Sequence, residues 1–359
     1  MEPEHIAPPP RPRMHKGAFV VATLVTGLVV ALIIVGSRGL RDFDSALIGY
    51  AVASLFAIAV LLYRYVLWIL RPPTGRYFRA GWSSFFSWQN FRRFTTLVPR
   101  ALWTDIFAQT FILKRSLYRW VMHMSLFWGV LLSLFVTIPL TFGWLHFTLE
   151  DVDTYRIWFF GLPLFTFPVE AGIGFAFFHA LDITAFLLMV GVVMALWRRL
   201  RDSGLLATQR FGFDMVPLVL LAAIAITGLA LTASSMWWGG RFYWFISLTH
   251  QVTVVAWFLT LPFGKFFHII QRPASIGVTL YQKVNQNREH SEQQTVGVCK
   301  RCGEELPSQQ FIRDLRAVLQ DLDQNYDLGA HDNLHEYCPH CKRVLRGQAY
   351  YAMMKKRFV

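Results

Sequence analysis

The sequence has few charged residues for its length. Asp, Glu, Lys and Arg make up 16% of the 359 residues, whereas 54% are hydrophobic and the mean hydropathy is +0.38. Because soluble domains carry about 25% charged residues, this composition excludes a water-soluble globule of this size. It predicts a membrane protein whose surface contacts lipid.

Acidic residues are scarcer than basic ones, with 22 Asp and Glu against 35 Lys and Arg and a net charge of +13. The basic residues cluster beside apolar runs, without the basic stripe or base-reading motif of a nucleic-acid-binding protein. We therefore expect no nucleic-acid partner and assign the positive charge to membrane topology.

Cysteine is absent from the first 298 residues. The four cysteines form two CxxC pairs, Cys299 with Cys302 and Cys338 with Cys341. This pattern indicates a metal site rather than the disulfide framework of a secreted domain. Four thiolates complete a closed tetrahedral site for zinc, which we prefer, or for a single iron as in rubredoxin.

The 35 residues between the two pairs exceed the usual spacing of a zinc ribbon. A predicted amphipathic helix explains the extra length. Its apolar side carries Phe311, Leu315, Val318, Leu319 and Leu322. A zinc-filled ribbon of this kind would dock a partner subunit, whereas an iron occupant would make it a redox relay.

Six apolar stretches are long enough to cross a bilayer core of about 30 Å, which requires about 20 residues per helix. They are 17–36, 45–70, 118–143, 172–197, 214–237 and 242–270. The predicted fold class is an all-α membrane protein, a bundle of six transmembrane helices with a small cytoplasmic metal-binding tail that carries the four cysteines. The predicted parts are an N-terminal tail (1–16), the membrane domain (17–272), a linker (273–296) and a zinc-ribbon-like domain (297–359).

The loops on the two sides of the predicted bundle differ in charge. Arginine and lysine concentrate in 71–119 and 198–210, whereas 144–171 carries four acidic residues and only Arg156. The positive-inside rule predicts both termini in the cytoplasm and a multi-pass protein of the inner cell membrane. No small-residue cleavage site closes the first apolar run, so we expect no removable signal peptide. The aromatic and basic segment 85–111 is typical of a helix lying on a membrane surface or docking a partner.

Four histidines lie within the predicted spans, where ionisable residues by default mark function. They are His123, His179, His250 and His268. On a straight last helix, the 18 residues from His250 to His268 make about five turns, so both imidazoles share a face about 27 Å apart. The predicted topology then pairs His123 with His268 near the cytoplasm and His179 with His250 near the outside.

Two stacked bis-histidine sites suit two b-type haems, although each histidine taken alone could merely hydrogen-bond a neighbouring helix. Arg119 and Lys265, each about one turn before a histidine of the cytoplasmic pair, are candidates to bind haem propionates. His146 competes as a ligand near the outside. Three glycines are candidates to let a macrocycle approach: Gly129, Gly172 and Gly174.

Two sequence segments carry a family resemblance: RWVMHMSLFWG in the third span, and SLTHQVTVVAWFLTLPFGKFFHII, followed by Arg272 and Pro273, in the last. Residues 110–275 resemble the di-haem membrane cytochrome b family that includes the gamma subunit of respiratory nitrate reductase and the membrane subunit of heterodisulfide reductase. The resemblance implies that His123 and His268 bind the cytoplasmic-side haem. It also implies electron exchange between menaquinone or ubiquinone and a hydrophilic iron–sulfur subunit docked on one membrane face.

The chain departs from this family pattern at the outer haem, because the family carries a second histidine ten residues after the first and this chain has Ser133 there. His179 is a substitute ligand opposite His250. Alternatively, the second haem is missing and His250 belongs to a quinone pocket. Asp182, one turn after His179, suits quinone-linked proton transfer or a helix-packing hydrogen bond.

Two functions from other classes compete with the electron-transfer interpretation. In a proton- or metal-coupled transporter, the intramembrane histidines and Asp182 would line a path, although no inverted repeat or pair of broken helices is evident in the sequence. In a haem-free membrane anchor, the four-cysteine tail would recruit a soluble enzyme. Absence of haem would favour the anchor.

Overall fold

The computed structural model describes residues 15–85, 88–202, 210–274, 276–277, 297–307, 309–322, 324, 326–329 and 332–357. Most of the predicted N-terminal tail and most of the predicted linker lie outside these residues. The chain forms two compact units. Unit 1 comprises 1–67 and 109–269, and unit 2 comprises 68–108 and 270–359, a division that differs from the predicted domains.

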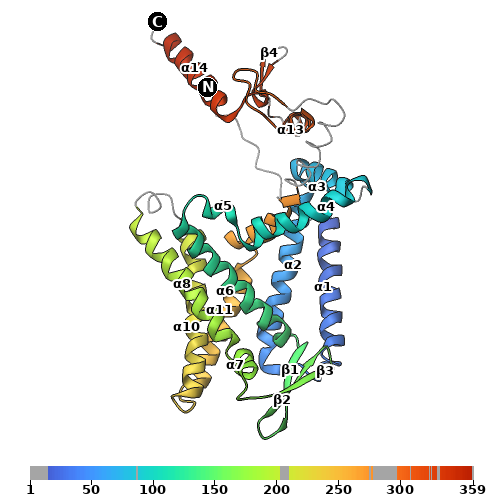
Figure 1. Ribbon diagram of the computed structural model, residues 1–359, viewed down its shortest axis with the longest axis vertical. Helices are drawn as coiled ribbons and strands as arrows, with labels where there is room; N and C mark the ends of the chain where they lie inside the picture. The colour runs from blue at the N-terminus through green and yellow to red at the C-terminus, as the bar shows by residue number, and fades with distance from the viewer. Residues whose placement is uncertain are drawn as a thin grey trace, which may run out of the picture. The chain divides into compact units, whose positions relative to one another are not determined.

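Within the described residues, five helical segments are long and apolar enough to span a membrane (Figure 1). They are α1 (Lys16–Gly36), η1 with α2 (Ser45–Leu47 and Ile48–Leu70), α6 (Leu117–Thr141), α8 (Ala180–Arg201) and η3 with α10 (Phe211–Met215 and Val216–Met236). Helices suit this role because each satisfies its own backbone hydrogen bonds in a solvent that offers none. Leu24, Leu28 and Val35 of α1 remain largely exposed, as expected of side chains that face lipid. The prediction of a helical membrane protein is therefore confirmed.

The last predicted span is not one straight helix. Helix α11 (Tyr243–Thr260) is followed by a helical segment, Lys265–Ala274, at an angle of 64° to it. Pro262 lies in the break, where its ring prevents a regular helix, and Arg64 of α2 donates a hydrogen bond to its carbonyl. The prediction that His250 and His268 share a face of one straight helix is therefore wrong. The described part of the chain therefore has five candidate spans, or six if the bent pair is one span.

The fourth predicted span begins later than expected. Residues Gly172–Phe178 form a separate short helix, α7, and α8 begins at Ala180, so that His179 stands at the junction. A Cβ on Gly174 would lie 2.4 Å from the carbonyl oxygen of Val169, so this turn of α7 folds closely onto the preceding strand. The predicted span 172–197 placed His179 about two turns inside one continuous helix, and this prediction is wrong.

The all-α prediction is also wrong for residues 145–168. They form an antiparallel sheet of β1 (Leu145–Asp151), β2 (Thr154–Phe159) and β3 (Leu162–Pro168), in the order β1-β2-β3. Phe160 and Gly161 link β2 to β3 with φ of 51° and 72°, the positive values that a tight hairpin turn requires. Ile157 and Phe167 are buried, and the ring of Phe167 packs against those of Phe177 and Phe178 in α7.

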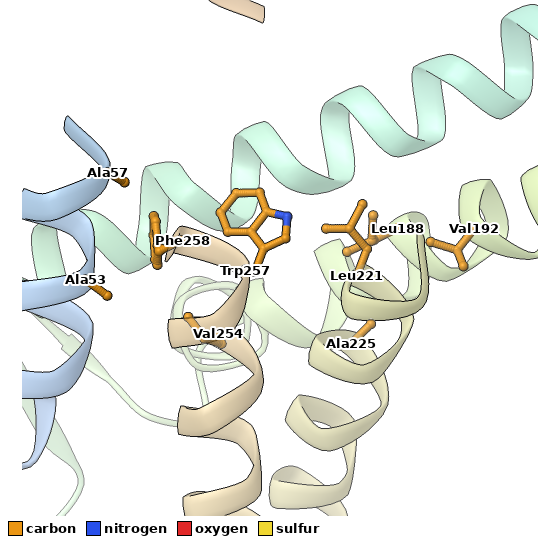
Figure 2. Packing of buried hydrophobic residues seen from close by; sticks show 9 residues of the cluster. All are labelled: Ala53, Ala57, Leu188, Val192, Leu221, Ala225, Val254, Trp257 and Phe258. Carbon is orange, nitrogen blue, oxygen red and sulfur yellow. The ribbon is translucent and has the colours of Figure 1, made fainter. Parts of the chain in front are cut away.

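The core of unit 1 lies among four of its helices. Figure 2 shows small and large side chains interleaved there. They are Ala53 and Ala57 of α2, Leu188 and Val192 of α8, Leu221 and Ala225 of α10, and Val254, Trp257 and Phe258 of α11. Helix α6 packs on α8 through glycines. A Cβ on Gly129 would lie 2.8 Å from Leu188 Cα, and one on Gly191 would lie 2.7 Å from the backbone nitrogen of Leu126. Gly129 therefore admits a neighbouring helix, as small residues do in membranes, and not a macrocycle.

Unit 2 contains helices of the long basic loop and of the four-cysteine tail. The first group is α3 (Pro72–Phe85), α4 (Trp88–Ala101) and the π-helical turn η2 (Leu102–Phe107); α5 (Thr110–Leu113) follows in unit 1. The tail comprises α13 (Gln309–Asp321), β4 (Asp327–Gly329), β5 (Asp332–Asn333), η5 (Leu334–Glu336) and α14 (Pro339–Arg357). Tyr77 of α3 contacts Phe311 of α13, with ring centroids 5.5 Å apart. The inserted helix between the CxxC pairs is confirmed.

Candidate functional site

A cavity of about 420 Å³ lies between α2, α6, α8, α10 and α11 of unit 1. Most of its wall is apolar, supplied by leucine, valine, alanine and aromatic side chains. Its polar side chains are Tyr50, Ser133, Thr137, Thr141, Asp182, Thr232 and His250. A mostly apolar cavity of this size with a few polar groups is typical of a small-molecule site.

His250 reaches the cavity from α11, and its hydrogen bonding determines its tautomer. Its Nδ1 lies 2.9 Å from Thr227 Oγ1. The Thr227 hydroxyl has a single hydrogen, and the carbonyl oxygens of its own helix accept it, Ala223 at 2.6 Å and Ile224 at 3.2 Å. His250 Nδ1–H is therefore the donor to Thr227, and in the neutral ring Nε2 has no hydrogen. Nε2 is left as a hydrogen-bond acceptor or a metal ligand.

Asp182, near the start of α8, supplies the only carboxylate among the residues that line the cavity. Its Oδ2 lies 2.9 Å from His179 Nδ1, and its Oδ1 accepts a hydrogen bond of 2.7 Å from the Thr232 hydroxyl of α10. Its side chain is 17% exposed and that of His179 is 24% exposed. His179 itself does not line the cavity. The Asp182–His179 pair, here called the dyad, therefore joins the cavity wall to a more exposed imidazole.

The predicted outer pair of histidines is only half assembled around the cavity, because His250 lines it and His179 does not. Ser133 of α6 does line it, and its hydroxyl bonds the carbonyl oxygen of Gly129 and Thr184 Oγ1, each at 2.8 Å. His146 lies elsewhere, in β1, with its ring stacked on Trp158. These residues offer the cavity one imidazole, not two.

The predicted cytoplasmic pair also lies in unit 1. His123 is half-buried on α6, whereas His268 is exposed and follows the turn η4 (Lys265–Phe267). His268 Nδ1 lies 2.5 Å from the carbonyl oxygen of Lys265. Because a carbonyl only accepts, Nδ1 carries the hydrogen and Nε2 is free to bind a metal, the arrangement usual for ligating histidines. Neither histidine lines the cavity.

The two predicted propionate partners differ in their surroundings. Arg119 is exposed near the start of α6. Lys265 forms an ion pair with Asp214, and Arg199 Nη1 lies 3.7 Å from the same carboxylate oxygen. The charge of Lys265 is therefore already matched within the protein. Arg119 remains as the candidate for a propionate.

The four cysteines come together in unit 2. Their Sγ atoms all lie within 4.8 Å of one another, and Cys302 Sγ is 3.6 Å from Cys338 Sγ. A tetrahedral site with zinc–sulfur bonds of about 2.3 Å places sulfurs about 3.8 Å apart, so this cluster fits one metal ion. Cys299, Cys338 and Cys341 are buried and Cys302 is exposed. The prediction of a four-cysteine cluster able to bind a metal ion is confirmed.

The backbone of the cluster favours ionised sulfur. Cys338 N–H donates to Cys299 Sγ at 3.3 Å, and Cys341 N–H donates to Cys338 Sγ at 3.4 Å. Burial opposes ionisation of Cys299, but backbone donors from Cys338, Cys302 and Arg301 outweigh it and lower the pKa of this thiol to about 6. Burial instead raises the pKa of the Cys341 thiol to about 12. A cation at the centre would stabilise all four thiolates.

Ion pairs hold the surroundings of the cluster in place. Lys300, between the first two cysteines, bonds Asp332 at 3.0 Å and Glu336 at 2.5 Å. Arg316 of α13 bonds Glu336 at 3.4 Å and Asp327 at 3.2 Å. The inserted helix and the second CxxC pair are thus tied to the first.

Several residues of the site were not predicted from the sequence. Thr227 and Thr232 are hydroxyls in an otherwise apolar span, and Arg64 and Asp214 are charges within predicted spans. Polarity at membrane depth is the signal that would have drawn attention to them. Their partners, however, lie on other helices. Comparisons with protein families, curated proteins and solved structures found no match to this chain.

Proposed function

We propose that this chain is the membrane electron-transfer subunit of a respiratory complex, which passes electrons between a quinone pool and a hydrophilic iron–sulfur partner. The observation that carries the proposal is the cavity, whose mostly apolar wall includes one imidazole, His250, with Nδ1 engaged by Thr227, and one carboxylate, Asp182. A quinol is an apolar ring with two hydroxyl groups, so this combination suits it. The family resemblance of residues 110–275 points to the same function.

The residues of the cavity account for the protons of quinol oxidation. Two O–H bonds break, and two electrons and two protons leave the ring. His250 Nε2 takes one proton, and Asp182 takes the other and passes it toward His179, the more exposed member of the dyad. Menaquinone and ubiquinone both fit this chemistry, and the reverse reaction uses the same groups.

One b-type haem is proposed, between His123 and His268. When bound, it supplies a one-electron carrier. His268 is exposed, and the contact of its Nδ1 with the Lys265 carbonyl orients the ring, which supports its role as a ligand. A second haem in the cavity is not supported, because Ser133 stands where the resemblance places its ligand and His179 lies outside the lining. Arg119 would bind a propionate.

Zinc is proposed at the four-cysteine cluster, where it would stabilise a docking module for the hydrophilic partner. An iron ion there would instead extend the electron path to that partner. The basic residues of 71–119 and 198–210 support a cytoplasmic location for these two loops, and with them for both termini. The chain would then lie in the inner cell membrane.

The first test is a dithionite-reduced minus oxidised absorption spectrum of the purified chain, with pyridine haemochrome and metal quantitation on the same sample. One haem b and one zinc per chain are expected. His268→Ala and His123→Ala should abolish the haem, whereas His250→Ala should keep it and lose its reduction by quinol. His146→Ala, outside the cavity, is the control and should keep both. A chain without haem, expressed with adequate haem supply, would refute the proposal.

A proton- or metal-coupled transporter is the second candidate, and one observation favours it. The chain is broken at Pro262, with a 64° bend, and again at His179 beside Asp182. Broken helices beside an intramembrane carboxylate are typical of transport sites. Absence of haem together with an ion flux in proteoliposomes that Asp182→Asn abolishes would establish this alternative.

A further inference from the structure

Helix α14 is more basic than any other described helix of the tail. Its nineteen residues contain six Lys and Arg and no Asp or Glu. Arg343 and Arg346 are exposed and form no ion pair within the described residues. Three nearby acids, Asp327, Asp332 and Glu336, are bound to Lys300 and Arg316. These three acids are therefore engaged by other cations and are not paired with Arg343 or Arg346.

The same helix carries exposed side chains with apolar bodies. Tyr350, Tyr351 and Met353 are 66–68% exposed, and Met354 is 58% exposed. Positions 343, 346, 350, 353 and 354 follow the i, i+3, i+7, i+10, i+11 spacing of one helix face. The opposite side contains Cys341, which is buried in the cysteine cluster, and the half-buried Leu345. One stripe of arginine, tyrosine and methionine therefore points away from the cluster.

We propose that this stripe of α14 binds the anionic phospholipid surface of the membrane that the chain itself spans. Arginine pairs with lipid phosphate, tyrosine lies at the headgroup level, and methionine enters the boundary with the acyl chains. The choice of lipid rests on charge complementarity and on proximity, because the tail is joined to the membrane helices by the same chain. The proposal is independent of haem and quinone.

The helix is suited to an adjustable association. Gly347 lies in its middle, and an added Cβ there would meet nothing within 4 Å. Glycine weakens a helix relative to alanine, so the last turns should exchange their amide hydrogens readily unless a surface holds them. Amide exchange of residues 347–357 is therefore a sensitive measure of binding.

The test compares hydrogen–deuterium exchange of the full-length chain in nanodiscs of phosphatidylcholine alone and of phosphatidylcholine mixed with phosphatidylglycerol. Slower exchange at 347–357 in the anionic discs is expected, and salt should reverse it. Arg346→Gln should reduce the lipid-dependent protection about fivefold. Tyr350→Ser with Met354→Ser should reduce it further. Lys355→Gln, a charge-matched change off the stripe, should have a smaller effect than Arg346→Gln.

Two controls separate lipid binding from folding. Metal content should be unchanged in every variant, and Gly347→Ala should slow exchange in both kinds of disc because it strengthens the helix itself. Equal exchange in neutral and anionic discs would overturn the proposal. Protection that appears only when a soluble partner protein is added would also overturn it and assign the stripe to that protein.

Discussion

The hydrogen bond between Thr227 and His250 offers the sharpest test of the cavity. Thr227→Val keeps the shape of the side chain but removes the oxygen that accepts from His250 Nδ1–H at 2.9 Å. Without that oxygen, the ring of the free protein moves its hydrogen to Nε2, which removes the acceptor offered to a quinol. To bind the quinol, the ring must return the hydrogen to Nδ1, where it no longer has the Thr227 oxygen as a partner, at a cost of about 1–3 kcal/mol. This cost weakens quinol binding.

The expected loss of the haem reduction rate follows from that range of free-energy cost. A deficit of about 1–3 kcal/mol corresponds to a reduction of about 5- to 150-fold in the rate of quinol-dependent haem reduction at low quinol concentration. Haem content and the dithionite-reduced spectrum should not change, because the hydrogen bonds of Thr227 join it to Ala223, Ile224 and His250, none of them a proposed haem ligand. The assay is stopped-flow haem reduction by a short-chain quinol, with dithionite as the reference for total reducible haem.

Two variants control this experiment. Thr227→Ser should restore most of the rate, because its hydroxyl can still accept from the ring and donate to the helix. Thr249→Val removes a hydroxyl that bonds only the carbonyl oxygen of Phe245 on its own helix, and it should leave the rate unchanged. A Thr227→Val protein that is reduced by quinol as fast as the unaltered protein would refute the assignment of His250 to the site.

Three further predictions concern other parts of the molecule. Ser133→His should add a second imidazole to the cavity that His250 lines, and the haem content measured by pyridine haemochrome should then rise toward two per chain. An unchanged haem content would contradict the inference that Ser133 stands at the position of a second haem ligand. Cys338→Ser should reduce the zinc content measured by elemental analysis from one per chain to nearly none, whereas His340→Ala should not. Because structural zinc contributes about 10–16 kcal/mol to the free energy of folding, the tail of Cys338→Ser should also become sensitive to protease. Gly129→Ala should lower the free energy of unfolding by about 1–3 kcal/mol, because the added methyl group overpacks against α8. Gly27→Ala, where an added Cβ meets open space, should not lower it. Equal denaturation midpoints in detergent for Gly129→Ala and the unaltered protein would show that α6 and α8 are less closely packed.

Local sequence patterns predicted the helices but not their interruptions. Long apolar runs require helices in lipid whatever their neighbours, so the spans near 17–36, 45–70, 118–143 and 214–237 were predicted within a few residues. The bend after α11 was missed because a proline can be accommodated within a membrane helix. Arg64 of α2 donates to the carbonyl of Pro262 across the bundle, and no pattern within the last span reveals that contact.

The sheet at 145–168 illustrates a different failure. Its strands contain the alternating aromatic and β-branched residues typical of a sheet, and Gly161 marks a tight turn. The interpretation as a loop followed from its position between two membrane spans. A local signal was present there and was overruled by an assumption about topology.

The sequence by itself determined the class of protein, the approximate spans and the four-cysteine cluster, because each depends on composition or on short spacings that local geometry obeys. Only the tertiary structure decided which polar groups meet. It joined His250 to Thr227, His179 to Asp182 and Lys265 to Asp214, and it brought Ser133 rather than His179 to the cavity wall. Such pairings depend on the rotation and depth of separate helices, and these are set by side-chain packing between elements distant in the chain.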